Sequence, residues 1–121
     1  MSIVASLLSI ILFLAFFSAG IQKLQFNPMV SATAQHLGFT KSSYRKIGVL
    51  EILGGIAVLI GLAGARGSVL GIINEAAALG LALMMGGAVL MHLKKRDSAK
   101  QYSPALILLL LALIEVASRL A

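Results

Sequence analysis

The sequence contains no cysteine among its 121 residues, and this absence removes several kinds of chemistry at once. A disulfide framework, a thiolate metal site and dithiol redox chemistry all require thiols. Any electron transfer would therefore need a bound cofactor or a partner protein. Tryptophan is absent as well, and only two tyrosines are present. Aromatic cages for organic cations, which are built from such rings, are consequently not expected.

Charged residues are also scarce, at 12%, whereas hydrophobic residues make up 60% of the chain. Soluble domains have about 25% charged and about 45 to 50% apolar residues. The composition thus excludes an ordinary soluble domain and indicates a membrane protein. Ten Lys and Arg against four Asp and Glu give a net charge of +6. Because these basic residues cluster between apolar runs, we interpret them as an orientation signal and expect no nucleic-acid partner.

Four apolar runs are long enough to cross a bilayer as helices, which takes about 20 residues each. They cover residues 3–21, 47–65, 68–93 and 102–120. None alternates as a membrane barrel strand does. We therefore predict an all-α fold in which residues 1–121 form a single domain, a four-transmembrane-helix bundle. A cleaved signal peptide is a weaker interpretation of the first run, because no Lys or Arg precedes it.

The connection between the first two runs is too long to be an idle tether. Asn27 followed by Pro28 is typical of a helix start, and Gly38 is a plausible helix stop. We predict a short interfacial helix over about residues 28–37, lying on the cytoplasmic leaflet, with an ordered loop as the alternative. Thr40 is then expected to cap the helix that leads into the second span.

Lysine and arginine are unevenly distributed over the two sides of the predicted bundle. Eight lie in or beside the two long connections, namely Lys23, Lys41, Arg45, Lys46, Lys94, Lys95, Arg96 and Lys100. Only Arg66 and Arg119 lie on the opposite side. The positive-inside rule therefore predicts cytoplasmic connections and both termini outside.

Ionisable residues inside membrane spans are costly and rarely face lipid, so their depth is informative. On the cytoplasmic side the predicted polar layer contains Gln22, Lys23, Glu51 and His92. Lys23 and Glu51 are at comparable depth, which predicts an ion pair between the first and second spans. A pair that only pins the bundle together is the favoured interpretation, and a functional pair is the alternative.

A second predicted polar layer lies on the outer side and contains Glu75, Glu115, Asn74, Arg66 and Arg119. Arg119 follows Glu115 by one helical turn and can pair with it. Glu75 has no evident cation on its own helix, so desolvation favours its protonated form and makes it the expected proton-exchanging residue. The alternative is a structural network of the four charged residues.

Other features of the spans are weaker signals. The third run carries a stripe of small residues with polar ends that we expect to face the interior, at positions 71, 75, 78, 82, 85, 89 and 92. Glycine-rich faces allow close helix packing within the bundle or in a homodimer. His92 without cysteine partners is a poor metal or haem ligand, and no metal site is expected. No phosphate loop, nucleophile elbow or zinc spacing occurs.

The order and spacing of several short motifs resemble the DoxX-like family of small four-helix integral membrane proteins. The resemblance runs through residues 17–24, 37–39, 44–55, 61–62, 92–97 and 104–106, and so spans nearly the whole chain. In that family a Lys and a Glu recur at the positions of Lys23 and Glu51. The resemblance implies an integral membrane protein of a bacterial plasma membrane. It also implies a link to quinone-dependent oxidoreductases and to membrane redox or assembly complexes.

Three functions follow from these observations. The first is an accessory subunit, not itself an enzyme, that docks a membrane redox or assembly partner; a bound quinone is implied only by the resemblance. The second is a small transporter that exchanges a proton at Glu75 or Glu51 against a cationic or apolar solute. The third is a membrane enzyme acting on a lipid or isoprenoid, with Glu75 and Glu115 as acid and base. A pocket reaching Glu75 would favour the last two.

Overall fold

The structure is a computed structural model that describes residues 3–65 and 67–120, and this part of the chain is all-helical. Its five helices are α1 (Ile3–Gln25), α2 (Pro28–Leu37), α3 (Lys41–Gly61), α4 (Val69–Lys94) and α5 (Ala99–Leu120). No strand occurs in these residues, so the predicted all-α fold class is confirmed.

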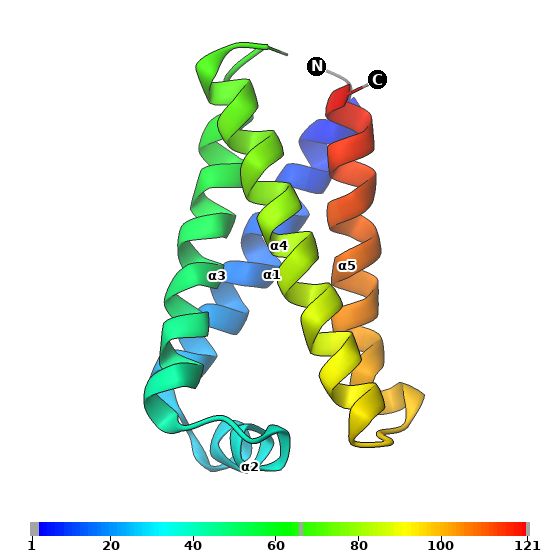
Figure 1. Cartoon of the computed structure of the whole chain (residues 1–121). Coiled ribbons are helices and arrows are strands. Elements are labelled where there is room, and N and C mark those ends of the chain that lie inside the picture. The colour runs from blue at the N-terminus through cyan, green and yellow to red at the C-terminus, as the bar shows by residue number, and fades with distance from the viewer. Residues whose placement is uncertain (1–2, 66, 121) are drawn as a thin grey trace.

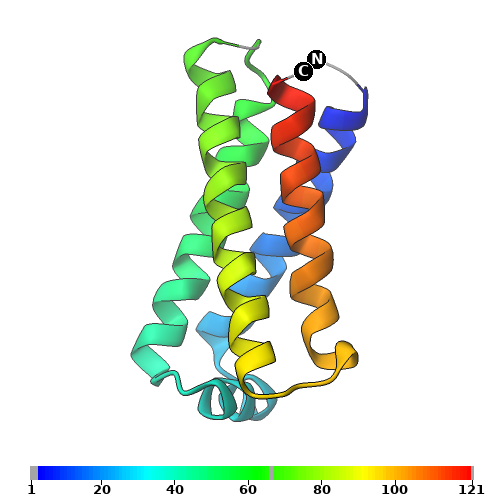
Figure 2. The same ribbon diagram turned by 45° about the vertical axis from the view of Figure 1, so that its right-hand side comes forward.

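The four long helices run side by side along one axis, and the short α2 lies across one end of them (Figure 1). The turn from α4 to α5 is also at this end, which we call the α2 end. The start of α1, the turn from α3 to α4 and the end of α5 gather at the opposite end, which we call the far end (Figure 2). The chain therefore traverses the bundle four times and returns to the end where α1 begins.

Three of the helices, α1, α4 and α5, are long and apolar enough to cross a membrane. The predicted second span is not among them. This span corresponds to α3. Every 18-residue stretch of α3 includes the charged residues Arg45, Lys46 and Glu51, which is too much charge for a helix identified by length and apolar composition alone. Within this predicted span, α3 ends at Gly61, four residues before residue 65, and the next residues form a turn.

The short helix between the first two long helices has the residues that the sequence predicted for it. Asn27 caps α2, its side chain accepting a hydrogen bond from the Val30 amide at 2.9 Å. Gly38 ends the helix in the left-handed conformation at φ 86°, which is a favourable C-terminal stop because glycine has no Cβ. Thr40 caps α3 by accepting a hydrogen bond from the Ser43 amide at 3.1 Å.

The interior is held by apolar packing between two helix pairs. α1 packs mainly against α3, and α4 packs against both α5 and α3. The buried core lies in the middle and consists of Leu12, Phe16, Val58, Ala78, Leu81, Ala82, Met85 and Ala112. Many large apolar side chains face outward instead, such as Ile3, Leu14, Leu83 and Leu90. An outward apolar surface of this extent is what a lipid-facing bundle requires.

α1 and α3 approach most closely where two glycines face each other. A Cβ on Gly20 would lie 2.5 Å from the Gly48 carbonyl oxygen, and one on Gly48 would lie 2.9 Å from the Gly20 carbonyl oxygen. Only glycine permits this separation. The crossing lies one helical turn from Lys23 on α1 and from Glu51 on α3, and therefore sets the distance between them.

Candidate functional site

The predicted ion pair between α1 and α3 is present at the α2 end of the bundle. Lys23 Nζ lies 2.8 Å from Glu51 Oε1, with the Lys23 side chain 18% exposed and the Glu51 side chain 1% exposed. The ring of Tyr44, about two turns before Glu51 on α3, has its centroid 5.3 Å from the Lys23 ammonium. Lys23 is therefore held by a carboxylate and an aromatic face together.

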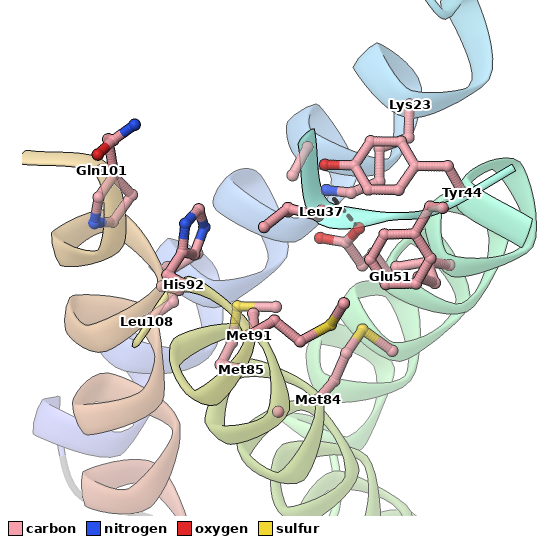
Figure 3. A pocket seen from close by; sticks show the side chains of 17 residues that line it. Lys23, Leu37, Tyr44, Glu51, Met84, Met85, Met91, His92, Gln101 and Leu108 are labelled. Carbon is pink, nitrogen blue, oxygen red and sulfur yellow. Dashed lines mark ion pairs between the residues drawn. The ribbon is translucent and has the colours of Figure 1, made fainter. Parts of the chain in front are cut away.

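A cavity of about 340 Å³ opens beside this ion pair, between all four long helices (Figure 3). Lys23, Tyr44 and Glu51 form its wall on the α1 and α3 side. Across from them α4 contributes three methionines, Met84, Met85 and Met91, and then His92. Gln101, Pro104, Ala105 and Leu108 complete the wall on α5, and Leu37 and Phe39 close it at the α2 end. The cavity is apolar over most of its surface, with polar groups at one end.

His92 of the same layer takes part in a polar bridge between elements that are far apart in the sequence. Its Nδ1 lies 2.7 Å from Asp97 Oδ2, and Nε2 of His36 on α2 lies 2.8 Å from Asp97 Oδ1. The hydrogen bond from His92, followed by that from His36, lowers the pKa of Asp97. The side chain of Gln22, the fourth predicted member of the layer, donates a hydrogen bond to Ser18 of its own helix at 3.5 Å.

At the far end the structure builds a second buried polar cluster around Asn74. Its side-chain amide donates to the Val58 carbonyl at 2.7 Å and to Ser9 Oγ at 3.2 Å. Ser9 in turn donates to Glu115 Oε1. Arg119 donates to Asn74 Oδ1 at 3.0 Å. Ser9, Asn74, Glu115 and Arg119 are all at most 3% exposed, so this cluster is shielded from solvent and lipid.

Arg119 also closes the end of α3. It donates to the carbonyl oxygens of Gly61 and Gly64 at 2.6 and 3.2 Å. The last carbonyls of a helix have no partner within the helix, and the guanidinium supplies one. The expected pairing of Arg119 with Glu115 is not found within the described residues, and Glu115 Oε2 is buried there without a hydrogen-bond partner.

Glu75 lies outside this cluster, contrary to its expected place on the inner face of the third span. The buried face of α4 runs instead through Gly71, Asn74, Ala78, Leu81, Ala82 and Met85. Glu75 is partly exposed, and no hydrogen bond or ion pair joins its side chain to residues 3–65 or 67–120. It does not line the cavity. Arg66, predicted for the same layer, lies outside the residues that the structure describes.

Sequence reasoning missed two participants that the structure brings into these clusters. Ser9 is a single hydroxyl within the apolar first run, and the rule that intramembrane polar groups face partners would have marked it. Asp97 is the only acidic residue in the basic connection after α4. Its partner His36 is 61 residues away, a separation that no local pattern bridges.

Residues 7–114 match the DoxX-like family. The chain belongs to this family. No match was found among curated proteins or among solved structures. Membership and the three apolar helices together identify an integral membrane protein. The matched region includes the cavity and the Lys23–Glu51 pair.

Proposed function

We propose that this DoxX-like protein binds the head group of a quinone in the cavity beside Lys23 and Glu51. In this role it would be a quinone-contacting accessory subunit of a membrane redox assembly. The observation that carries the proposal is the position of a charge-neutral ion pair in the wall of an otherwise apolar cavity of about 340 Å³. Binding sites for small organic ligands are typically of about 300 to 1,000 Å³ and apolar, with a few placed polar groups.

The proposal takes all four long helices as membrane spans, so that the cavity between them lies in the membrane. The outward surface of α3 supports its inclusion, because Val49, Leu50, Leu53 and Ile60 are each at least 43% exposed and would otherwise face water. Glu51 is the only charge in the apolar part of α3, and Lys23 neutralises it. Eight of the ten Lys and Arg residues then lie at the α2 end or beside it, so this end is cytoplasmic and α2 lies at the membrane surface.

The charge balance of the site favours a neutral ligand. An organic cation would compete with Lys23 for the single carboxylate, and an anion would compete with Glu51 for the single ammonium. A neutral carbonyl group needs only a hydrogen-bond donor. The Lys23 ammonium has three N–H donors, and the Gln101 amide and the Tyr44 hydroxyl also lie in the wall. The residues therefore fit a quinone head group.

The apolar part of the cavity fits the ring and the first part of an isoprenoid tail. Met84, Met85 and Met91 are unbranched and polarizable, so they adapt to a flat ring and make favourable sulfur contacts with it. A bound quinone would supply two-electron, two-proton chemistry that the thiol-free chain lacks. The residues named here bind and orient the ligand, and the electron donor is a partner protein.

The partner surface follows from the same orientation. The α2 end presents basic side chains to the cytoplasm, where a redox or assembly partner with an acidic surface can dock. Homodimerisation would use α4 around Gly80 and Gly86, where an added Cβ would have nothing within 4 Å and which do not line the cavity. The other helix-facing glycines are already used inside the bundle, as at Gly20 and Gly48.

Equilibrium binding of a quinone with a single isoprenoid unit to the purified protein tests this proposal. Ala88 lines the cavity, so Ala88→Phe should weaken binding by about tenfold or more, a change of about 1.4 kcal/mol. Leu83 is 71% exposed on the outer surface, so Leu83→Phe is the matched control and should bind as the wild type does. Equal binding by both variants, or displacement of the quinone by a quaternary ammonium ion, would overturn the proposal.

A further inference from the structure

α2 is joined to the rest of the molecule through two unusual backbone positions. Phe26, just before the helix, has φ 50°, and Gly38, just after it, has φ 86°. A left-handed conformation is uncommon for residues other than glycine, and it persists where the surrounding structure enforces it. α2 is thus a rigid ten-residue unit between two sharp changes of chain direction.

The packing beneath α2 is limited to a narrow seam. Val30, Ala34 and Leu37 are its buried residues, and the first two pack with Tyr44. Two further hollows lie on either side of this seam. One of about 220 Å³ lies towards α1 and shares Lys23 and Tyr44 with the main cavity. The other, of about 390 Å³, lies towards α4 and α5 and shares His92 and Gln101 with it. α2 therefore covers a space that it does not fill.

On the side that faces α4, α2 is held by a hydrogen bond to the carboxylate of Asp97. Both of its oxygens lie within hydrogen-bond distance of His36 Nε2, at 2.8 and 3.1 Å, and Oδ2 also accepts from His92 Nδ1. The Asp97 side chain is only 5% exposed. Within the described residues this is the one side-chain hydrogen bond that joins α2 to α4 or the connection after it.

The backbone around Asp97 is arranged to aim this carboxylate. Arg96 adopts φ 57°, a second left-handed residue that is not glycine. The Asp97 amide donates to the His92 carbonyl at 3.0 Å, which folds the chain back over the end of α4. The carboxylate then reaches both a residue of the cavity wall, His92, and a residue of α2, His36. A left-handed residue after the last turn is a common helix end, and here it also turns Asp97 back towards the end of α4.

From these observations we propose that α2 is a lid over the cavity and that the His36–Asp97–His92 bridge is the clasp that holds it closed. Opening requires the His36–Asp97 hydrogen bond to break, after which α2 can turn about Phe26 and Gly38. His92 belongs to the clasp and to the cavity wall. A ligand that contacts His92 therefore also changes how firmly the lid is held closed. The inference rests on the proposed function only in taking the cavity as the binding site.

A cysteine-accessibility measurement tests the lid without any quinone. The chain has no cysteine, so a single Ala105→Cys in the cavity wall is the only thiol. We expect a charged maleimide to react slowly with it. Asp97→Asn and His36→Gln should each speed the reaction by about ten- to a hundredfold, the factor for losing one hydrogen bond to a charged group.

Two controls make the result specific. Lys100→Gln changes a charge in the first turn of α5, close to the clasp but not part of it, and should leave the rate unchanged. A cysteine at exposed Ala65, at the far end of the bundle, should react equally fast in every variant. The His36 side chain is 45% exposed, so we expect His36→Gln to fold. It therefore tests the lid even if Asp97→Asn fails to fold. Unchanged rates in folded His36→Gln, or an equal increase in Lys100→Gln, would overturn the lid. Failure of quinone binding with the rates as expected would overturn only the proposed ligand.

Discussion

At the scale of single residues, the main electrostatic feature is the ion pair of Lys23 and Glu51. Their comparable depth on antiparallel helices predicted the pair, and the structure has it at 2.8 Å. The outer cluster was less predictable. Glu75 and Asn74 are adjacent, but one residue turns a side chain by about 100° around a helix. That rotation decides which of them is buried, and the buried one is Asn74.

Removing one partner of the ion pair should cost more than removing both. Lys23→Met leaves a carboxylate that is 1% exposed without its cation, and should lower the free energy of unfolding by about 3 kcal/mol. Glu51→Gln should cost less, because the freed ammonium is 18% exposed and can reach water. The double variant should recover much of the loss in detergent melting curves. Strictly additive losses would show that the two residues do not interact.

The clasp residue Asp97 should make stability depend on pH in the acid range. Its hydrogen bonds from His92 and His36 lower its pKa in the folded protein, so the unfolded chain takes up the proton first as pH falls. The stabilisation is therefore complete above the unfolded pKa and is lost as pH falls through the folded pKa.

The melting difference between wild type and Asp97→Asn should stay level from about pH 7 to about pH 5 and shrink below about pH 4. A difference that grows on acidification would contradict the assigned sign. His36→Gln, measured alongside, should show part of the same dependence.

At the scale of helices, local signals were reliable and contacts between helices were not. The caps at Asn27, Gly38 and Thr40 were predicted from residue type, because a cap depends on a few neighbouring backbone groups. Glycines in the spans were predicted to pack, but which ones would meet depends on how two helices cross. The structure selects Gly20 and Gly48 for the closest contact between α1 and α3.

An added methyl group should separate α1 from α3 at this crossing. Gly48→Ala places a Cβ 2.9 Å from the Lys23 Cβ and the Gly20 carbonyl oxygen, and should cost about 1 to 3 kcal/mol in unfolding free energy. Gly80→Ala is the control, because a Cβ added at Gly80 would have nothing within 4 Å. We expect it to be neutral or slightly stabilising. Equal losses in the two variants would mean that the crossing is not tightly packed.

For the whole molecule, the order of four long helices and the end where each connection lies were predictable from length and charge. The cavity was not. It exists because α1 and α3 on one side do not fill the space beside α4 and α5 at the α2 end, and no sequence pattern encodes that separation. Met84, Met85 and Met91 lie in its wall, although methionine in a span equally fits a packed core.

Single-cysteine labelling tests the orientation of the bundle and the crossing of the membrane by α4. Ala65→Cys lies in the turn at the far end and Ser98→Cys at the α2 end, and both native residues are exposed. In sealed vesicles an impermeant thiol reagent should reach position 98 from the cytoplasmic side only and position 65 from the opposite side only. Reaction of both from one side would mean that α4, the helix between the two positions, does not cross the membrane.

Photo-crosslinking with a photoreactive quinone in native-like membranes tests directly whether the cavity binds a quinone. We expect labelling within residues 84–92 of α4 and beside Lys23 of α1, which face each other across the cavity. Unmodified quinone should compete for this labelling, and Ala88→Phe should abolish it while Leu83→Phe preserves it. Labelling confined to outward residues such as Leu83 and Leu90, or insensitive to competitor and to Ala88→Phe, would contradict the assignment of the cavity as a quinone site.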